Sequence, residues 1–308
     1  MKIERIVIGT DFSAPSLEAA RWTAAHFAPG AELVLVYAIY FPEPPRFLRD
    51  RYPHVEELVE TARKGAEERL RALARSLVAL GAGRGTRTDV RVGVPSDAIA
   101  AAAAEHGAEL VVVGPHGERA RPWNLLGTTA QHLVSVSPVP VLLAAGRRAS
   151  RPRSILVPLL GADETPSVMA WTHRLAEHFD ADVTALHVVS SAVVSHLLAA
   201  APVPAGHAAE PNAEQLRDEV SREVSGEADR WMAGLLAAGL PRDRVSSEVA
   251  FGEAGQEILA TADRRESDLI VMGRARHAGS ARRALFGSVT SEVLRGARCP
   301  VLVVGEGE

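Results

Sequence analysis

The feature that most constrains this chain is an internal repeat of about 150 residues. Five segments of the first half recur in the same order in the second half, offset by 149 to 160 residues. The first pair of segments begins at residues 5 and 154, and the second pair surrounds Trp22 and Trp171. The other three pairs are 32–39 with 182–189, 90–114 with 249–273 and 137–144 with 297–304. A period this long is too large for a solenoid, so each copy is predicted to be a domain.

The length agrees with two domains. The chain has 308 residues, and a domain has about 100–200. The predicted domains are 1–145 and 153–305. The segment AGRRASRPR at 145–153 carries the charge and proline that are typical of a linker.

Within each copy, short apolar runs alternate with amphipathic stretches. In the first copy the strands are predicted at 3–9, 32–39, 86–92, 109–114 and 140–144, and the helices at 14–28, 54–80, 96–106 and 126–136. The strand runs are nearly continuous in Val, Ile and Leu rather than alternating, which is typical of parallel strands buried on both faces. The predicted fold class is α/β, with two tandem doubly wound (Rossmann-like) domains. Each is expected to be a five-stranded parallel sheet of order 3-2-1-4-5 flanked by helices.

Charge and composition exclude several classes of protein. A net charge of −4 and a pI near 6.3 give no basic surface for nucleic acid or an anionic membrane. The single cysteine, Cys299, excludes an intramolecular disulfide and a cysteine-based zinc site, and its apolar context predicts a small core residue. No apolar run of about 18 residues or signal-peptide pattern is found, and the histidines follow no metal-binding motif. We therefore expect a cytoplasmic protein without membrane segments or metal ligands.

A glycine-rich loop follows the fourth predicted strand. It has the pattern G-x2-G-x9-G-T, formed by Gly114, Gly117, Gly127 and Thr128. In a doubly wound sheet this position lies at the carboxyl edge, where ligands bind. Glycine lets the backbone approach a phosphate closely, and a helix N-terminus favours an anion. The simpler alternative is that the glycines make turns and that Thr128 or Thr129 caps a helix.

In these motifs the chain resembles the universal stress protein family in its tandem form. The resemblance covers nearly the whole chain and rests on the glycine motif, on Asp11 after the first strand and on the closing PVLL and CPVLVV strands. It implies an adenine nucleotide as ligand, namely ATP with or without Mg²⁺. It also implies pairing of the domains, and of two chains as a homodimer, through the last strands. Bare apolar edges at 140–144 and 300–304 favour the same pairing.

The resemblance also implies a set of binding residues in the first copy. Asp11 and Ala38 are expected at the nucleoside, and the ribose and phosphates are expected at Val113, Gly114, His116, Gly117, Gly127, Thr128 and Thr129. Alternatives remain for several of them. Asp11 or Ser13 is suited to cap helix 14–28. His116, Arg119 and Arg121 also fit a solvated loop.

The second copy departs from the motif. Gly273, Gly287 and Ser288 are retained, but Arg276 replaces the middle glycine and the loop is one residue longer. Leu160 occupies the aspartate position, with Asp163 three residues later. We expect nucleotide mainly in the first domain. The alternative is a phosphate site altered by Arg276, Arg282 and Arg283.

Three functions are compatible with these patterns. The leading one is an ATP-binding stress-response or regulatory protein that is not a dedicated enzyme. The second is a dimeric scaffold or protein-interaction module in which nucleotide binding is incidental or absent. The third is a slow ATPase or adenylyl-transfer enzyme, for which the sequence offers no positioned base and no motif for a second substrate.

Overall fold

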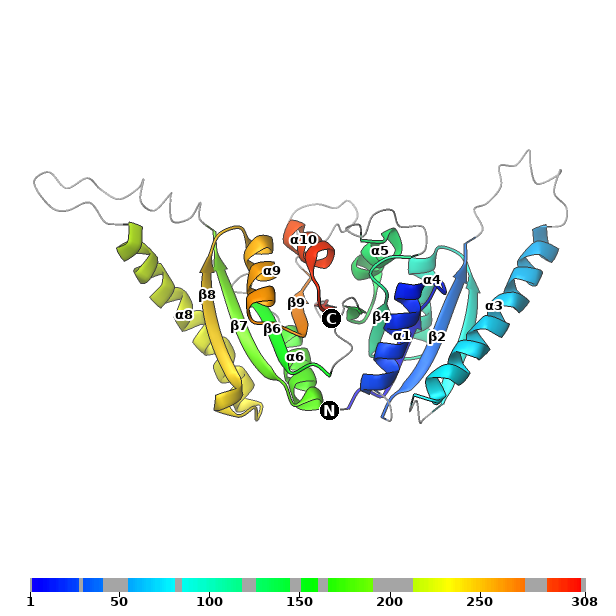
Figure 1. Ribbon diagram of the computed structural model, residues 1–308, viewed down its shortest axis with the longest axis horizontal. Helices are drawn as coiled ribbons and strands as arrows, with labels where there is room; N and C mark the ends of the chain where they lie inside the picture. The colour runs from blue at the N-terminus through cyan, green and yellow to red at the C-terminus, as the bar shows by residue number, and fades with distance from the viewer. Residues whose placement is uncertain are drawn as a thin grey trace, which may run out of the picture. The chain divides into compact units, whose positions relative to one another are not determined.

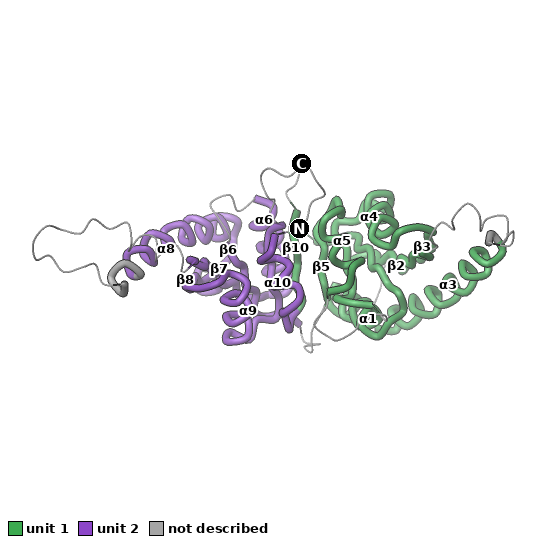
Figure 2. Tube along the Cα trace, turned by 90° about the horizontal axis from the view of Figure 1, so that it is seen from above, with its two compact units in different colours: residues 1–149, 276–286, 300–305 green, residues 150–275, 287–299, 306–308 purple. Residues whose placement is uncertain are grey.

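The computed structural model describes residues 2–27, 30–40, 55–80, 85–117, 126–144, 151–159, 166–190, 213–274 and 287–305. The chain divides into two compact units, coloured separately in Figure 2. The first unit comprises residues 1–149, 276–286 and 300–305, and the second comprises 150–275, 287–299 and 306–308. The final strand of the second repeat thus belongs to the first unit.

The described part of the first repeat alternates strands and helices, as predicted (Figure 1). Its elements are β1 (Arg5–Gly9), α1 (Ala14–Phe27), β2 (Glu32–Ile39), α3 (Val55–Val78), β3 (Thr86–Val92), α4 (Pro95–Glu105), β4 (Leu110–Val113), α5 (Thr128–Val136) and β5 (Val141–Leu143). Every predicted strand and helix of this copy is present, and no end differs by more than two residues.

The second repeat follows the same order. Its elements are β6 (Ser154–Leu159), α6 (Pro166–Phe179), β7 (Asp182–Val189), α8 (Ala213–Ala237), the short helix η1 (Arg242–Arg244), β8 (Val245–Phe251), α9 (Ala254–Arg264), β9 (Leu269–Gly273), α10 (Ser288–Gly296) and β10 (Val301–Val304). The one additional element is η1, which immediately precedes β8.

Strand order confirms the predicted fold class. The first repeat has the order β3-β2-β1-β4-β5, and its pairs are parallel. In the second repeat the order is β8-β7-β6-β9-β10. Both repeats therefore have the doubly wound order 3-2-1-4-5. The last strands pair antiparallel with Leu302 opposite Leu142, so the two apolar edges cover each other and the sheet is mixed.

The core of the first unit lies between its parallel strands and two helix layers. Helix α1 packs with α3, and α4 packs with α5. The inner strands β1, β2 and β4 are mostly buried because both faces are covered, and β4 is buried at all four positions, whereas the edge strand β3 has no buried position. Cys299, which belongs to the second unit, is also buried, as predicted for a small core residue.

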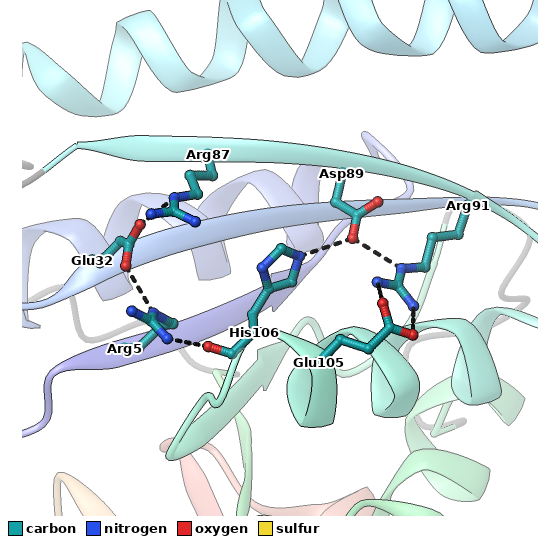
Figure 3. Close-up of polar contacts among 7 residues, drawn as sticks. All are labelled: Arg5, Glu32, Arg87, Asp89, Arg91, Glu105 and His106. Atoms are coloured by element: carbon teal, nitrogen blue, oxygen red, sulfur yellow. Dashed lines mark hydrogen bonds and ion pairs between the residues drawn. The ribbon is translucent and has the colours of Figure 1, made fainter.

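Charged side chains interrupt the apolar pattern on the α4 face of β1, β2 and β3 (Figure 3). Arg5 and Arg87 bind Glu32, while Arg91 and His106 bind Asp89. Arg91 also binds the carboxylate of Glu105 through two nitrogens, at 2.6 and 3.0 Å. We call these seven residues the α4-face network.

One correspondence drawn from the sequence is wrong. Helices α1 and α6 both have 14 residues, and their buried faces coincide when Phe27 is matched with Phe179. At that offset of 152, Trp22 corresponds to Arg174 rather than to Trp171. An alignment that places Trp22 on Trp171 is therefore shifted by three residues from the alignment of the two helices.

Candidate functional site

Three segments of the first repeat meet at the carboxyl edge of the sheet. Asp11 follows β1 and is exposed, Gly117 lies in the loop after β4, and Gly127 immediately precedes α5. The topology brings β1 and β4 side by side as parallel neighbours, so the residues after them emerge at the same edge. We call this meeting point the candidate site.

The Asp11 carboxylate lies directly against Gly117. A Cβ atom placed on Gly117 would be 2.3 Å from Asp11 Oδ2, which is far inside any normal contact. Any side chain at this position would force the carboxylate to shift from where it lies. Asp11 and Gly117, which are 106 positions apart in the sequence, thus pack directly against each other.

The other two glycines of the motif also permit close contacts. A Cβ on Gly114 would lie 3.0 Å from backbone atoms of Pro15 and Ser16, at the start of α1. One on Gly127 would lie 3.2 Å from the Cα of His116. The Gly127 amide donates to the Pro115 carbonyl at 2.9 Å, which closes the loop onto itself.

Hydrogen bonds identify the helix caps that the sequence left open. The Ser13 carbonyl accepts from Leu17, and the Ser13 hydroxyl accepts from the amide of Ser16 at 3.4 Å. Ser13 is therefore the N-cap of α1. Its own amide and hydroxyl donate to Asp11 Oδ1, at 3.0 and 2.5 Å, so the cap also orients the aspartate.

At the start of α5 the N-cap is Gly127, with no side-chain capping bond. Thr128 and Thr129 are the first two residues of the helix, and neither caps it. Thr128 is exposed and Thr129 is half-buried. The first amides of a helix lack intrahelical partners and carry partial positive charge, so this end can receive an anion.

The remaining predicted residues have different degrees of exposure. Gly114 and His116 are partly exposed, and Val113 is buried at the end of β4. Ala38 is half-buried on β2 and in register with Arg91 of β3. Arg119 and Arg121 lie outside the described residues.

The second repeat retains the framework with looser packing at its first glycine. A Cβ on Gly273 would meet Val168 at 3.5 Å, an ordinary contact. Gly287 again precedes a helix, and Ser288 is its first residue. Leu160, Asp163, Arg276, Arg282 and Arg283 lie outside the described residues, so the altered loop stays a prediction.

Sequence reasoning missed three residues beside Asp11. The ring of Phe12 packs on Tyr37, with ring centroids 4.9 Å apart, and the Arg69 guanidinium lies 3.9 Å from the Phe12 centroid. The signal available in the sequence was an aromatic residue between Asp11 and the helix cap, where a small residue is the usual choice for a tight turn.

Comparison with known proteins decides the family. The profile of the universal stress protein family matches residues 2–145 and 152–305. The chain belongs to the universal stress protein family. Two family domains in tandem account for the repeat. The predicted boundaries, 1–145 and 153–305, stay a prediction, because the first compact unit includes the last strand of the second repeat.

Relatives of the same length exist. A universal stress protein of Mycolicibacterium smegmatis is 28% identical over 97% of this chain and 96% of its own. One from Mycobacterium tuberculosis is 26% identical over 98% and 96%. The crystal structure of a universal stress protein from Archaeoglobus fulgidus covers 100% of both chains with a TM-score of 0.66 at 18% identity, which supports the fold.

The described residues offer neither a metal site nor a membrane-spanning helix. Within the described residues, no group of three or more His, Cys, Asp or Glu side chains is placed to hold a metal ion. None of the helices in the described part of the chain is long and apolar enough to span a bilayer.

Proposed function

We propose that the first repeat binds an adenine nucleotide, ATP with or without Mg²⁺, at the candidate site. The protein then acts as a nucleotide-binding regulatory or stress-response protein of the cytoplasm rather than as a dedicated enzyme. The observation that carries the proposal is the contact between the Asp11 carboxylate and Gly117 beside the start of α5.

This contact combines two kinds of recognition at one edge of the sheet. A carboxylate accepts hydrogen bonds, so Asp11 is suited to an exocyclic amine or a ribose hydroxyl. The amides that begin α5, with the hydroxyls of Thr128 and Thr129, are suited to phosphate oxygens. Ala38, Val113, Gly114 and His116 complete the proposed lining.

The second repeat is proposed to bind nucleotide weakly or not at all. The aspartate position holds Leu160 and the middle glycine is Arg276. A hydrophobic residue cannot accept a hydrogen bond from the base, and an arginine adds bulk where the first repeat requires none. One bound nucleotide per chain is therefore expected.

The proposal is tested on the full chain. The protein is purified without added nucleotide and denatured, and the released small molecules are identified by mass spectrometry. ATP binding is then titrated calorimetrically for the wild type and for Asp11→Ala. We expect about one nucleotide per chain, and an affinity loss of about tenfold or more for Asp11→Ala.

A matched pair of glycine variants tests the packing argument. Gly117→Ala places a methyl group on the Asp11 carboxylate and should weaken ATP binding at least tenfold. Gly65→Ala, in α3 where nothing lies within 4 Å of an added Cβ, should leave binding unchanged and stabilise the helix by about 0.5–1 kcal/mol.

Other outcomes decide against the proposal. A protein that carries no nucleotide and binds no added ATP would favour the scaffold function. Steady ATP turnover that is lost in Asp11→Ala would favour an enzyme. Two equivalent nucleotides per chain would contradict the asymmetry between the repeats.

A further inference from the structure

Phe12 has an unusual backbone conformation at the candidate site. Its φ is 64°, in the left-handed region, where an aromatic residue is a rare outlier. It directly follows Asp11 and precedes Ser13, the cap of α1. A conformation of this kind persists only when surrounding contacts hold it.

Contacts from two other elements hold the Phe12 ring. Tyr37 on β2 packs against it with an interplanar angle of 33°. Arg69 on α3 places its guanidinium 3.9 Å from the ring centroid, within cation–π distance. The ring is thus contacted by the sheet and by a helix, and we call Phe12, Tyr37 and Arg69 the Phe12 clamp.

The backbone around Phe12 is bonded so that its conformation controls Asp11. The Phe12 amide donates to Thr10 Oγ1 at 3.0 Å, and the next amide, of Ser13, donates to Asp11 Oδ1 at 3.0 Å. Rotation of Phe12 to a negative φ would redirect the chain on both sides of it. The Asp11 carboxylate would then leave Gly117.

The second repeat has different chemistry at the matching positions. When β2 and β7 are aligned end to end, Tyr37 corresponds to His187. The buried positions Leu70 and Leu77 of α3 match Ala228 and Leu235 of α8, which places Glu227 at the position of Arg69. Glu227 acts electrostatically on His187, so an acid replaces the clamping cation.

We propose that Arg69, acting through Phe12, is a positioning residue that holds Asp11 against Gly117 for nucleotide binding. The inference rests on the proposed function and extends it to residues on β2 and α3. It also gives a second physical reason for binding in the first repeat: with Leu160 at the aspartate position, Gly161 stands where Phe12 does, so the second repeat offers no aromatic ring for a cation to hold.

The test compares two exposed arginines of α3. Arg69→Ala removes the cation from the clamp, while Arg71→Ala removes an arginine that bonds only Glu67 among the contacts described for it, at 2.8 Å. We expect ATP affinity, measured calorimetrically on the full chain, to fall about fivefold for Arg69→Ala. It should stay within twofold for Arg71→Ala, and Arg69→Lys should restore most of the affinity.

A double-mutant cycle separates positioning from general stability. If Arg69 acts through Asp11, then Arg69→Ala should lower the ATP affinity less than threefold when Asp11 is already replaced by asparagine. Equal losses in both backgrounds, or an unchanged affinity in the single variant, would overturn the inference. Thermal unfolding of each variant, monitored by circular dichroism, identifies a loss of ATP affinity that is caused only by unfolding of the protein.

A crystal structure of Arg69→Ala gives a readout that does not depend on nucleotide. We expect Phe12 to leave the left-handed region and the Asp11 carboxylate to move away from Gly117. An unmoved Asp11 would overturn the positioning role even if the wild type binds ATP. If the wild type binds no ATP, the proposed function fails, and this structure still decides whether Arg69 positions Asp11.

Discussion

Thr172 and Thr290 are fully buried side chains whose hydroxyls have no hydrogen-bond partner among the described residues. Thr23 is buried to the same degree, but its hydroxyl donates to the Ala19 carbonyl at 2.7 Å. An unpaired buried hydroxyl loses its bonds to water without replacement, so its burial is unfavourable. The same residue type therefore has opposite effects in α1 and α6.

Replacement by valine measures this difference, because valine matches threonine in shape and lacks the hydroxyl. We expect Thr172→Val and Thr290→Val each to raise the free energy of unfolding by about 1 kcal/mol. Thr23→Val breaks a hydrogen bond and should lower it by about 1 kcal/mol. Urea unfolding followed by circular dichroism gives all three values, and a loss of stability in both Thr172→Val and Thr290→Val would contradict the argument.

At the scale of elements, the α4-face network joins three strands to one helix. Glu32 on β2 accepts from Arg5 on β1 at 2.7 Å and also pairs with Arg87 on β3. Arg5 in turn donates to the His106 carbonyl at the end of α4. The second repeat has a related arrangement, in which Glu248 on β8 binds Arg265 just after α9, at 2.5 Å. An acid on the third strand that binds a basic side chain just after the following helix, Asp89 with His106 and Glu248 with Arg265, recurs in both repeats.

The network predicts a pH dependence of stability. The hydrogen bond from Arg5, reinforced by the charges of Arg5 and Arg87 and opposed by burial, lowers the pKa of Glu32 below its ordinary value of 4.5. The unfolded chain then binds the proton more readily than the folded one. The stabilisation from Glu32 is complete above pH 4.5 and is lost as the pH falls through the lower folded value.

Glu32→Gln removes this titration. We expect the variant to be less stable than wild type by about 1 kcal/mol at pH 7, because the charged hydrogen bond with Arg5 is lost. The difference should be smaller at pH 3, because part of the charge on Glu32 is then lost. Urea unfolding at both pH values measures it. A difference that is the same at pH 7 and pH 3 would show that packing, and not charge, is responsible.

At the scale of the whole molecule, the last strand connects the two repeats. β10 comes from the end of the second repeat, belongs to the first compact unit and pairs with β5. Val301, Leu302 and Val303 of β10 are each 2% exposed or less. A chain cut between the repeats would leave β5 with a bare apolar edge, so the full chain is the proper material for binding experiments.

Removal of β10 tests this role. A chain ending at Cys299 should self-associate through the uncovered edge of β5 and show a larger mass than the full chain in light scattering after size exclusion. Its unfolding temperature should also fall. A chain ending at Gly305, which keeps β10, is the control. Equal masses and equal unfolding temperatures for the two shortened chains would refute the role of the strand.

The helices and strands of the first repeat follow from local sequence. Continuous Val, Ile and Leu runs give strands, amphipathic stretches give helices, and their alternation gives a parallel sheet. The Trp22–Trp171 match failed because letters alone do not show which helix face is buried. Likewise, Asp11 and Ser13 both suit a cap, and only the bond geometry assigns the cap to Ser13.

The sequence by itself determined the repeat and the α/β fold class, because the alternation of apolar and amphipathic runs, and its recurrence in the second half, can be read from the residues in order. Tertiary structure decided that Gly117 lies against the Asp11 carboxylate, because the two meet only when β1 and β4 are adjacent. It also decided the Phe12 clamp and the place of β10. Both depend on contacts between residues far apart in the chain, and such contacts leave no local pattern to read.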